Sequence, residues 1–113
     1  MYSQQQVDQL VQDLCIGLKP LFPEGAMEAI LFGSCARGNA EKGSDVDVMV
    51  LVDSPREDIA GKTWEISEVA ARLLLSSGVV VSPIVENRGY FQQHADFFPF
   101  YRNVIREGVR YSA

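Results

Sequence analysis

The chain has 113 residues, of which 47% are hydrophobic and 22% charged, and its formal net charge is -5. This length predicts a single domain over residues 1–113 with a packed core, and the composition excludes disordered and fibrous proteins. The negative charge, with Lys and Arg scattered along the chain, disfavours nucleic acid as the main partner.

Cysteine usage and hydropathy bear on where the protein works. Cys15 and Cys35 have neither a CxxC nor a zinc-ligand spacing, which predicts reduced thiols in a cytosolic protein. The N-terminus lacks a basic region followed by an apolar core, and no apolar run approaches the roughly 18 residues of a membrane span. We therefore expect a cytoplasmic protein without a signal peptide.

Helix and strand signals alternate in the first half of the chain. Ser3 and Gln6 have the spacing of a capping box, and apolar residues then recur at helical spacing, which predicts a helix over residues 4–18. The apolar runs 27–32 and 46–52 have no helical period and predict buried strands. The second of these strands is expected at the centre of the sheet.

A short helix and a loop are predicted between these two strands, and a long helix is predicted after the second strand. Residues 34–38 can form a short helix, and residues 39–44 are polar and Gly-containing, which indicates a loop. Ser54 followed by proline is a helix start with Ser54 as N-cap, and one helix should run from there to Gly78. Trp64 is expected to pack half-buried beside the apolar stripe of this helix.

The last part of the chain predicts a strand and a helix. Residues 79–85 form the strand, which lies at an edge or bulges because Pro83 cannot donate a ladder hydrogen bond. The final helix covers residues 99–107 and ends at Gly108. His94, the only histidine, has no nearby acid or serine pattern, so a packing or surface role is expected.

Aromatic residues are dense near the C-terminus. They either cap the core of the sheet or form a hydrophobic patch for a partner. The residues are Tyr90, Phe91, Phe97, Phe98, Phe100 and Tyr101.

The order of elements predicts the fold class. Helix, strand, turn, strand, helix, strand and helix indicate a small α/β (α+β) domain with a mixed sheet and helices mainly on one face. The sheet has three strands, or four if another short strand is present.

Two acidic residues stand at the start of the strand 46–52. Asp45 and Asp47 are two residues apart, so their side chains project from one face, about 6.6 Å apart along the strand. A divalent cation relieves their repulsion, and magnesium, which takes few protein carboxylates, is the natural fit. Upstream, Gly33 lets a phosphate approach the backbone, and Ser34 offers a hydroxyl and an amide. For the acidic pair alone, solvated carboxylates at a strand-entry turn are the alternative.

These two stretches together resemble a known signature. The run Gly33-Ser34-Cys35-Ala36-Arg37-Gly38, followed by Ser44-Asp45-Val46-Asp47-Val48, is similar to the motif of the DNA polymerase β-like nucleotidyltransferase superfamily. In length, element order and C-terminal tail, the chain looks like a minimal nucleotidyltransferase (MNT) of the kind paired with HEPN-domain proteins. The resemblance implies the nucleotidyltransferase fold.

The resemblance also implies an activity and a set of site residues. The expected reaction is magnesium-dependent transfer of a nucleoside monophosphate from a nucleoside triphosphate, ATP in the first place, to a hydroxyl. In HEPN-paired members that hydroxyl belongs to a tyrosine of the partner toxin, which implies an antitoxin role and a homo- or hetero-oligomer. The implied nucleotide-binding residues are Gly33, Ser34, Arg37 and Ser44, and the catalytic ligands of two Mg²⁺ ions are Asp45 and Asp47. For Arg37, a structural role in pinning the loop 39–44 is an equal alternative.

One departure from the superfamily pattern stands out. The full active site has a third carboxylate on the next strand, which binds metal and helps to deprotonate the acceptor hydroxyl. Residues 79–85 carry no acid, and Ser82 occupies the middle of this strand. Glu86 can substitute only if Pro83 leaves the register favourable.

The missing acid leaves competing functions open. Loss of a general base typically costs about 10²- to 10⁴-fold, so the chain is either a slow enzyme or a nucleotide-binding antitoxin or regulator that acts by contact alone. A subunit of a larger antibiotic- or RNA-modifying assembly is a third interpretation. The absence of a second domain and of a basic stripe argues against an independent enzyme of either kind.

Overall fold

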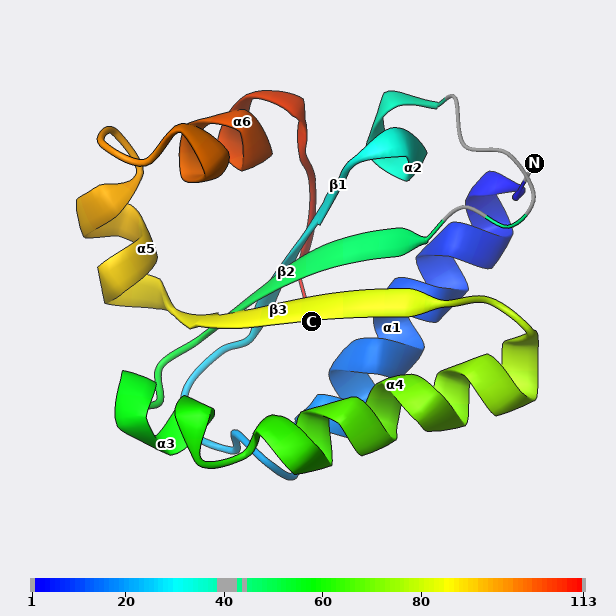
Figure 1. Ribbon diagram of the computed structural model, residues 1–113, viewed down its shortest axis with the longest axis horizontal. Coiled ribbons are helices and arrows are strands. Elements are labelled where there is room, and N and C mark those ends of the chain that lie inside the picture. The colour runs from blue at the N-terminus through cyan, green and yellow to red at the C-terminus, as the bar shows by residue number, and fades with distance from the viewer. Residues whose placement is uncertain (1, 39–42, 44, 113) are drawn as a thin grey trace.

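A four-stranded mixed sheet organises the protein, as the computed structural model shows for residues 2–38, 43 and 45–112 (Figure 1). The strand order is β3-β2-β1-β4, with β1 antiparallel to β2 and β4, and β2 parallel to β3. The elements are α1 (Gln4–Leu18), β1 (Glu28–Phe32), α2 (Ser34–Arg37), β2 (Val46–Val52), α3 (Arg56–Ala60), α4 (Thr63–Ser77), β3 (Val81–Asn87), α5 (Arg88–His94), α6 (Pro99–Glu107) and β4 (Val109–Ser112). The predicted α+β class is confirmed, and β4 is the fourth strand.

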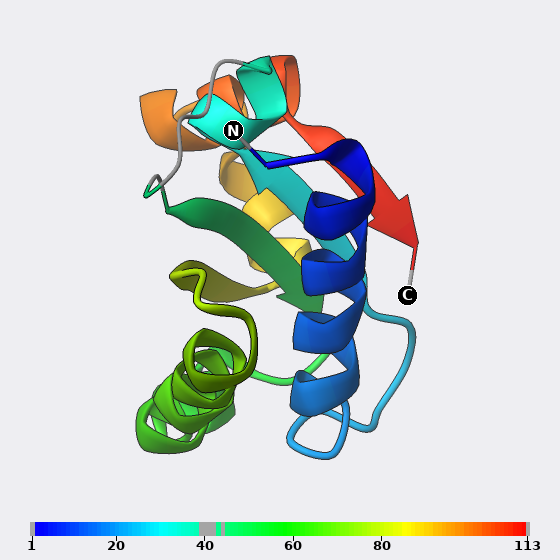
Figure 2. The ribbon, with the colours of Figure 1, turned by 90° about the vertical axis from the view of Figure 1, so that its right-hand side faces the viewer.

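One face of the sheet is covered by the two longest helices, α1 and α4 (Figure 2). The predicted capping box is present, because Ser3 Oγ accepts from the Gln6 N–H and the Gln6 side chain accepts from the Ser3 N–H. Helix α1 then buries one apolar side against the sheet, as its spacing predicted. The sheet residues in this core layer include Ala29, Leu31, Val48, Val50 and Val52.

The other face of the sheet is covered by α5 and α6. Met49 and Leu51 of β2 pack there against Phe91 of α5 and Tyr101 of α6. The expectation that helices lie mainly on one face therefore holds for the two 15-residue helices, while the shorter α5 and α6 close the second face. The two faces matter for function because alternate residues of β2 point to opposite sides.

The predicted single helix after Ser54 is wrong, because the chain forms α3 and α4 with a break between them. Gly61 ends α3, and its N–H donates to the Glu57 carbonyl. Ser54 does not cap α3; it is buried, and its carbonyl accepts from Asn87 Nδ2 at 2.9 Å. Trp64 is also mispredicted, since it is 76% exposed on α4.

Strand β3 lies at an edge of the sheet, which is one of the two positions that Pro83 predicted. Its register with β2 is continuous from Val46 opposite Val81 to Val52 opposite Asn87, so Pro83 introduces no bulge. No helix in the described ranges 2–38 and 45–112 is long and apolar enough to cross a membrane. The two cysteines are free, as expected for thiols.

Candidate active site

The turn after β1 brings the backbone against an acidic side chain. Gly33 has φ +75° and ψ −157°, a conformation that only glycine adopts readily. A Cβ atom at this position would lie 2.5 Å from Asp47 Oδ2. Both the backbone angles and the close approach therefore require glycine, and Ser34 follows it as the first residue of α2.

Asp45 and Asp47 meet at the entrance to β2. Asp47 is half-buried and lies opposite Phe32 in the antiparallel ladder, whereas Asp45 is exposed just before the strand. Burial, and then the negative charge of Asp45, raise the pKa of Asp47 above its ordinary value. Strand alternation turns Asp47 to the face that holds Met49, so the carboxylate lies on the side of α5 and α6.

Two further side chains contact the acidic pair. The Cys35 thiol donates a weak, 3.7 Å hydrogen bond to the Asp45 carbonyl, which ties α2 to the start of β2. The pKa of Cys35 is raised by burial and by the negative charge of Asp47. On the other side, Ser82 Oγ lies 3.4 Å from Asp45 Oδ2. The sequence predicts only a reduced thiol at Cys35, although its place two residues after Gly33 could have indicated this contact.

The strand position that would carry a third acid holds a hydroxyl. Ser82 is the register partner of Asp47 in the parallel pairing of β2 with β3. Glu86 lies opposite Leu51, four residues further along, which is about 13 Å from Ser82 along the strand. The structure therefore does not bring Glu86 to the two aspartates.

Glu86 has a different set of partners. It is only 7% exposed, and its carboxylate accepts from Tyr101 Oη at 2.8 Å and from Arg56 Nε at 3.1 Å. The guanidinium of Arg56 also lies over the ring of Tyr90, 3.6 Å from its centroid. This cluster joins α3, β3, α5 and α6 at the far end of β3.

Arg37 contacts the last helix. Its Nη1 atom forms an ion pair at 3.3 Å with Glu107 Oε2, which links α2 to α6. A contact of Arg37 with the triphosphate stays a prediction. Ser44, the fourth expected nucleotide-binding residue, lies outside the described residues, as does most of the loop that Arg37 was expected to pin.

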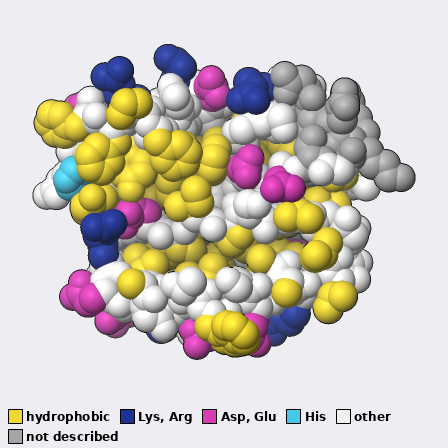
Figure 3. All heavy atoms as spheres, in the orientation of Figure 1, with side chains coloured by type: hydrophobic (Ala, Val, Ile, Leu, Met, Phe, Trp, Pro, Cys, Tyr) yellow, Lys and Arg dark blue, Asp and Glu magenta, His cyan; other side chains and the backbone are white. Residues whose placement is uncertain are grey.

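The C-terminal aromatics divide between core and surface. Phe91 and Tyr101 are buried against the sheet, whereas Phe97 is 74% exposed and Phe100 is 44% exposed. Figure 3 shows hydrophobic side chains gathered over α5 and α6, on the same side of the molecule as a pair of acidic side chains. His94 has the expected packing role, because its ring stacks on Tyr90 at a centroid distance of 4.0 Å.

The donor set suits a hard divalent cation. Asp45 and Asp47 supply carboxylate oxygens, the ligands that magnesium prefers, and their repulsion, which helps to raise the pKa of Asp47, would be relieved by a positive charge. Among the described residues, no group of three or more His, Cys, Asp or Glu side chains could hold a metal ion. Two carboxylates nevertheless suffice for magnesium when phosphate oxygens and water complete its coordination.

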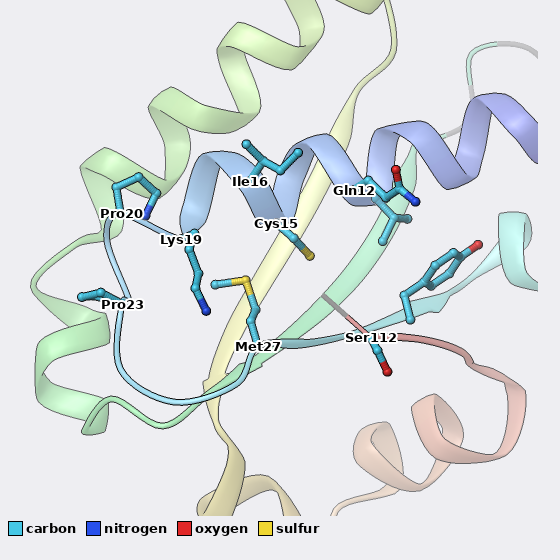
Figure 4. A pocket seen from close by; sticks show the side chains of 10 residues that line it. Gln12, Cys15, Ile16, Lys19, Pro20, Pro23, Met27 and Ser112 are labelled. Atoms are coloured by element: carbon cyan, nitrogen blue, oxygen red, sulfur yellow. The ribbon is translucent and has the colours of Figure 1, made fainter.

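A separate apolar cavity of about 810 Å³ lies beside α1 (Figure 4). It opens between α1, the start of β1 and the end of β4. The described residues that line it include neither Asp45 nor Asp47, so it is not part of the acidic site. The lining residues are Val11, Gln12, Cys15, Ile16, Lys19, Pro20, Pro23, Met27, Tyr111 and Ser112.

The fold and the Gly-Ser turn beside two aspartates are those of a nucleotidyltransferase. Residues 17–108 match the family described as "Nucleotidyltransferase domain", and the chain belongs to this family. Among curated relatives, it is 30% identical to "Putative protein adenylyltransferase MJ0604" of Methanocaldococcus jannaschii over 101 residues, 89% of this chain and 93% of the relative. It is 28% identical to "Putative protein adenylyltransferase MJ0141" of the same organism over 80 residues, 71% and 79% of the two chains.

Proposed function

We propose that the protein transfers AMP from ATP, in a magnesium-dependent reaction, to a hydroxyl of a partner protein. The observation that carries this proposal is the approach of Gly33 to Asp47, which places the Gly-Ser turn against the acidic pair. The family supports nucleotidyl transfer, and the names of both relatives support an adenylyl group and a protein acceptor. The resemblance to MNT proteins further supports a HEPN-domain toxin as the partner and an antitoxin role.

Different residues would bind the phosphates and the magnesium ion in such a transfer. Gly33 and Ser34 would bind the phosphates through the backbone and the Ser34 hydroxyl, while Asp45 and Asp47 would hold magnesium. When bound, magnesium neutralises phosphate charge and stabilises the attacking and leaving oxygens. The acceptor oxygen forms a bond to the α-phosphorus, the bond to the bridging oxygen breaks, and diphosphate leaves. The hydroxyl proton passes to water, because Ser82 offers no carboxylate to receive it.

The direct test is labelling of the partner. Purified protein is incubated with magnesium, α-labelled ATP and a HEPN-domain protein of the kind that the proposal names as its partner, and that partner should acquire the label and the mass of one AMP. Asp45→Asn and Asp47→Asn should each reduce this labelling by at least about 10²-fold, because each removes a charged ligand of the cation. A partner that stays unlabelled with the wild-type chain contradicts the proposal.

A second candidate function is an antitoxin or regulator that binds nucleotide and acts by contact alone. It is favoured by Ser82, which places a hydroxyl opposite Asp47 where catalysis would use an acid. The exposed rings of Phe97, Phe98 and Phe100 would supply an apolar contact surface. Toxin neutralisation in cells separates the two functions, because Asp47→Asn abolishes neutralisation by an enzyme and leaves neutralisation by contact unchanged.

A further inference from the structure

Helix α4 packs one apolar side on the protein and carries two large apolar side chains on the opposite, exposed side. Val69 and Leu73 are 4% and 8% exposed and face the core. Trp64 and Leu75 are 76% and 87% exposed. At 100° per residue, Trp64 and Leu75 lie about 180° from the middle of the buried side, so the exposed pair points straight out of the molecule.

The exposed side of α4 has the spacing of a helix–helix seam. Trp64, Glu68, Ala71 and Leu75 follow each other at intervals of four, three and four residues, which is the heptad pattern of packed helices. Figure 3 shows a hydrophobic group over α4 at the lower edge of the molecule, with acidic and basic side chains beside it. We call these four residues the α4 seam.

The charges that flank the α4 seam are complementary to those of a second copy of α4 that runs in the opposite direction. Glu65 and Arg72 lie on one side of the seam, and none of Glu65, Glu68 and Arg72 forms an ion pair among the described residues. In an antiparallel pair of seams, Glu65 of each copy faces Arg72 of the other, and Trp64 packs against Leu75. A parallel pair would instead put Glu68 against Glu68 in the seam, which repels.

We propose that the α4 seam is a homodimer interface, in which two copies pair their α4 helices antiparallel about a two-fold axis. A two-fold interface uses the same surface on both copies, and the arrangement of charges on α4 meets this condition. One 15-residue helix, about 22 Å long, gives a small contact on each side, so the dimer is weak, with a dissociation constant of about micromolar order.

The dimer interface is independent of the proposed transfer site. Helix α4 packs on the sheet face that carries Val48 and Val50, whereas Asp47 lies on the face of Met49. Dimerisation therefore leaves the acidic pair open, and the proposal does not depend on the transfer activity.

Sedimentation velocity of the full chain at about 1 to 200 μM tests the proposal. The weight-average mass should rise from 12.5 kDa toward twice that value. Trp64 is the only tryptophan, so its emission should shift to the blue over the same concentration range as the indole leaves water. Leu75→Glu should weaken the dimer by at least about tenfold, because it replaces the apolar side chain that packs against Trp64 of the other copy with a charge. Phe97→Glu is the matched control, since it replaces another exposed apolar side chain and should leave the dimer unchanged.

Charge reversal tests the antiparallel arrangement. Arg72→Glu should weaken the dimer by several-fold, and the double variant Glu65→Arg with Arg72→Glu should restore it, because the opposite charges again face each other. A chain that stays monomeric at every concentration overturns the proposal. A dimer that tolerates Leu75→Glu, or that the double reversal fails to restore, overturns it as well.

Discussion

Asp47 and Ser82 are register partners on the two parallel strands β2 and β3, so a hydroxyl stands where the superfamily pattern has its third carboxylate. Ser82→Asp should place an acid beside Asp45, which Ser82 Oγ already approaches to 3.4 Å. If transfer is slow for want of a base, this variant should raise the rate of partner labelling by about 10- to 10²-fold, toward the usual range for general-base catalysis. Single-turnover labelling with saturating ATP measures the change.

Ser82→Asn is the matched control for this experiment. Asparagine has nearly the shape of aspartate but neither accepts a proton nor attracts a cation strongly. Equal rates for the two variants would show that the absence of a third acid does not limit the rate of transfer.

The raised pKa of Asp47 predicts how divalent cations and pH change stability. Its folded-state pKa lies above the ordinary 3.8, so folding disfavours the ionised form. The stabilising contribution of the neutral carboxyl is fully present below pH 3.8 and is lost as the pH rises through the raised value. In metal-free buffer at pH 7, Asp47→Asn should therefore melt at a higher temperature than the wild type, and this difference should disappear at pH 3.

Magnesium should reverse the order of the two melting temperatures, so that the wild type melts above Asp47→Asn. Bound cation stabilises the folded wild type by mass action, whereas Asp47→Asn lacks one of the two ligands and should gain little. Calorimetry with and without about 5 mM Mg²⁺ makes the comparison, and Asp58→Asn on α3, where the acid is exposed, corrects for the general loss of negative charge. Equal magnesium-induced shifts in wild type and Asp47→Asn would contradict a cation site at this pair.

Elements with strong local signals were predictable from the sequence. The Ser3 capping box specifies the start of α1, and Pro99 with Gly108 delimits α6, because these signals act within a few residues. The sequence does not mark the break at Gly61, since the apolar spacing continues across it. Strand β4 has no strong local signal, because its four residues are stabilised by pairing with β1, about 80 positions earlier in the chain.

The candidate site was predictable to the extent that its residues are close in sequence. Gly33 and the two aspartates belong to one motif, so their roles could be inferred before their positions were known. The position of Ser82 opposite Asp47 depends on the register of β3 with β2, two strands that α3 and α4 separate in the sequence. The contacts of Glu86 depend on Arg56 and Tyr101, from two other helices, and no local pattern encodes such an arrangement.

Gly33 offers a test of the close approach to Asp47. Gly33→Ala puts a methyl group 2.5 Å from Asp47 Oδ2 and also forces alanine to φ +75°. We expect a loss of about 1–3 kcal/mol in unfolding free energy from the backbone strain and a further loss of magnesium-dependent stabilisation from displacement of the carboxylate. Urea unfolding with and without Mg²⁺ and ATP separates these two effects.

Gly78→Ala is the control, because Gly78 has the same φ of +75° with no atom within 4 Å of the added Cβ. Gly78 has ψ 7°, in the left-handed helical region, so its variant should lose less stability than Gly33→Ala and should retain the full stabilisation by Mg²⁺ and ATP. If Gly33→Ala also retains this stabilisation, the turn does not position Asp47.

Two roles are open to Glu86, and one experiment separates them. Glu86 either stabilises the fold through its buried hydrogen bonds or serves as the third acid of the transfer reaction. Its carboxylate is buried and accepts from Tyr101, Arg56 and the Asn87 N–H, so Glu86→Gln should lower the unfolding free energy by about 1–3 kcal/mol. Tyr101→Phe removes one of these bonds and should cost about 1 kcal/mol. At a temperature where every variant is folded, both should label the partner within about threefold of the wild-type rate, because the cluster lies some 13 Å along β3 from Ser82. A stable Glu86→Gln protein that loses about 10²-fold in transfer would instead assign Glu86 to the reaction.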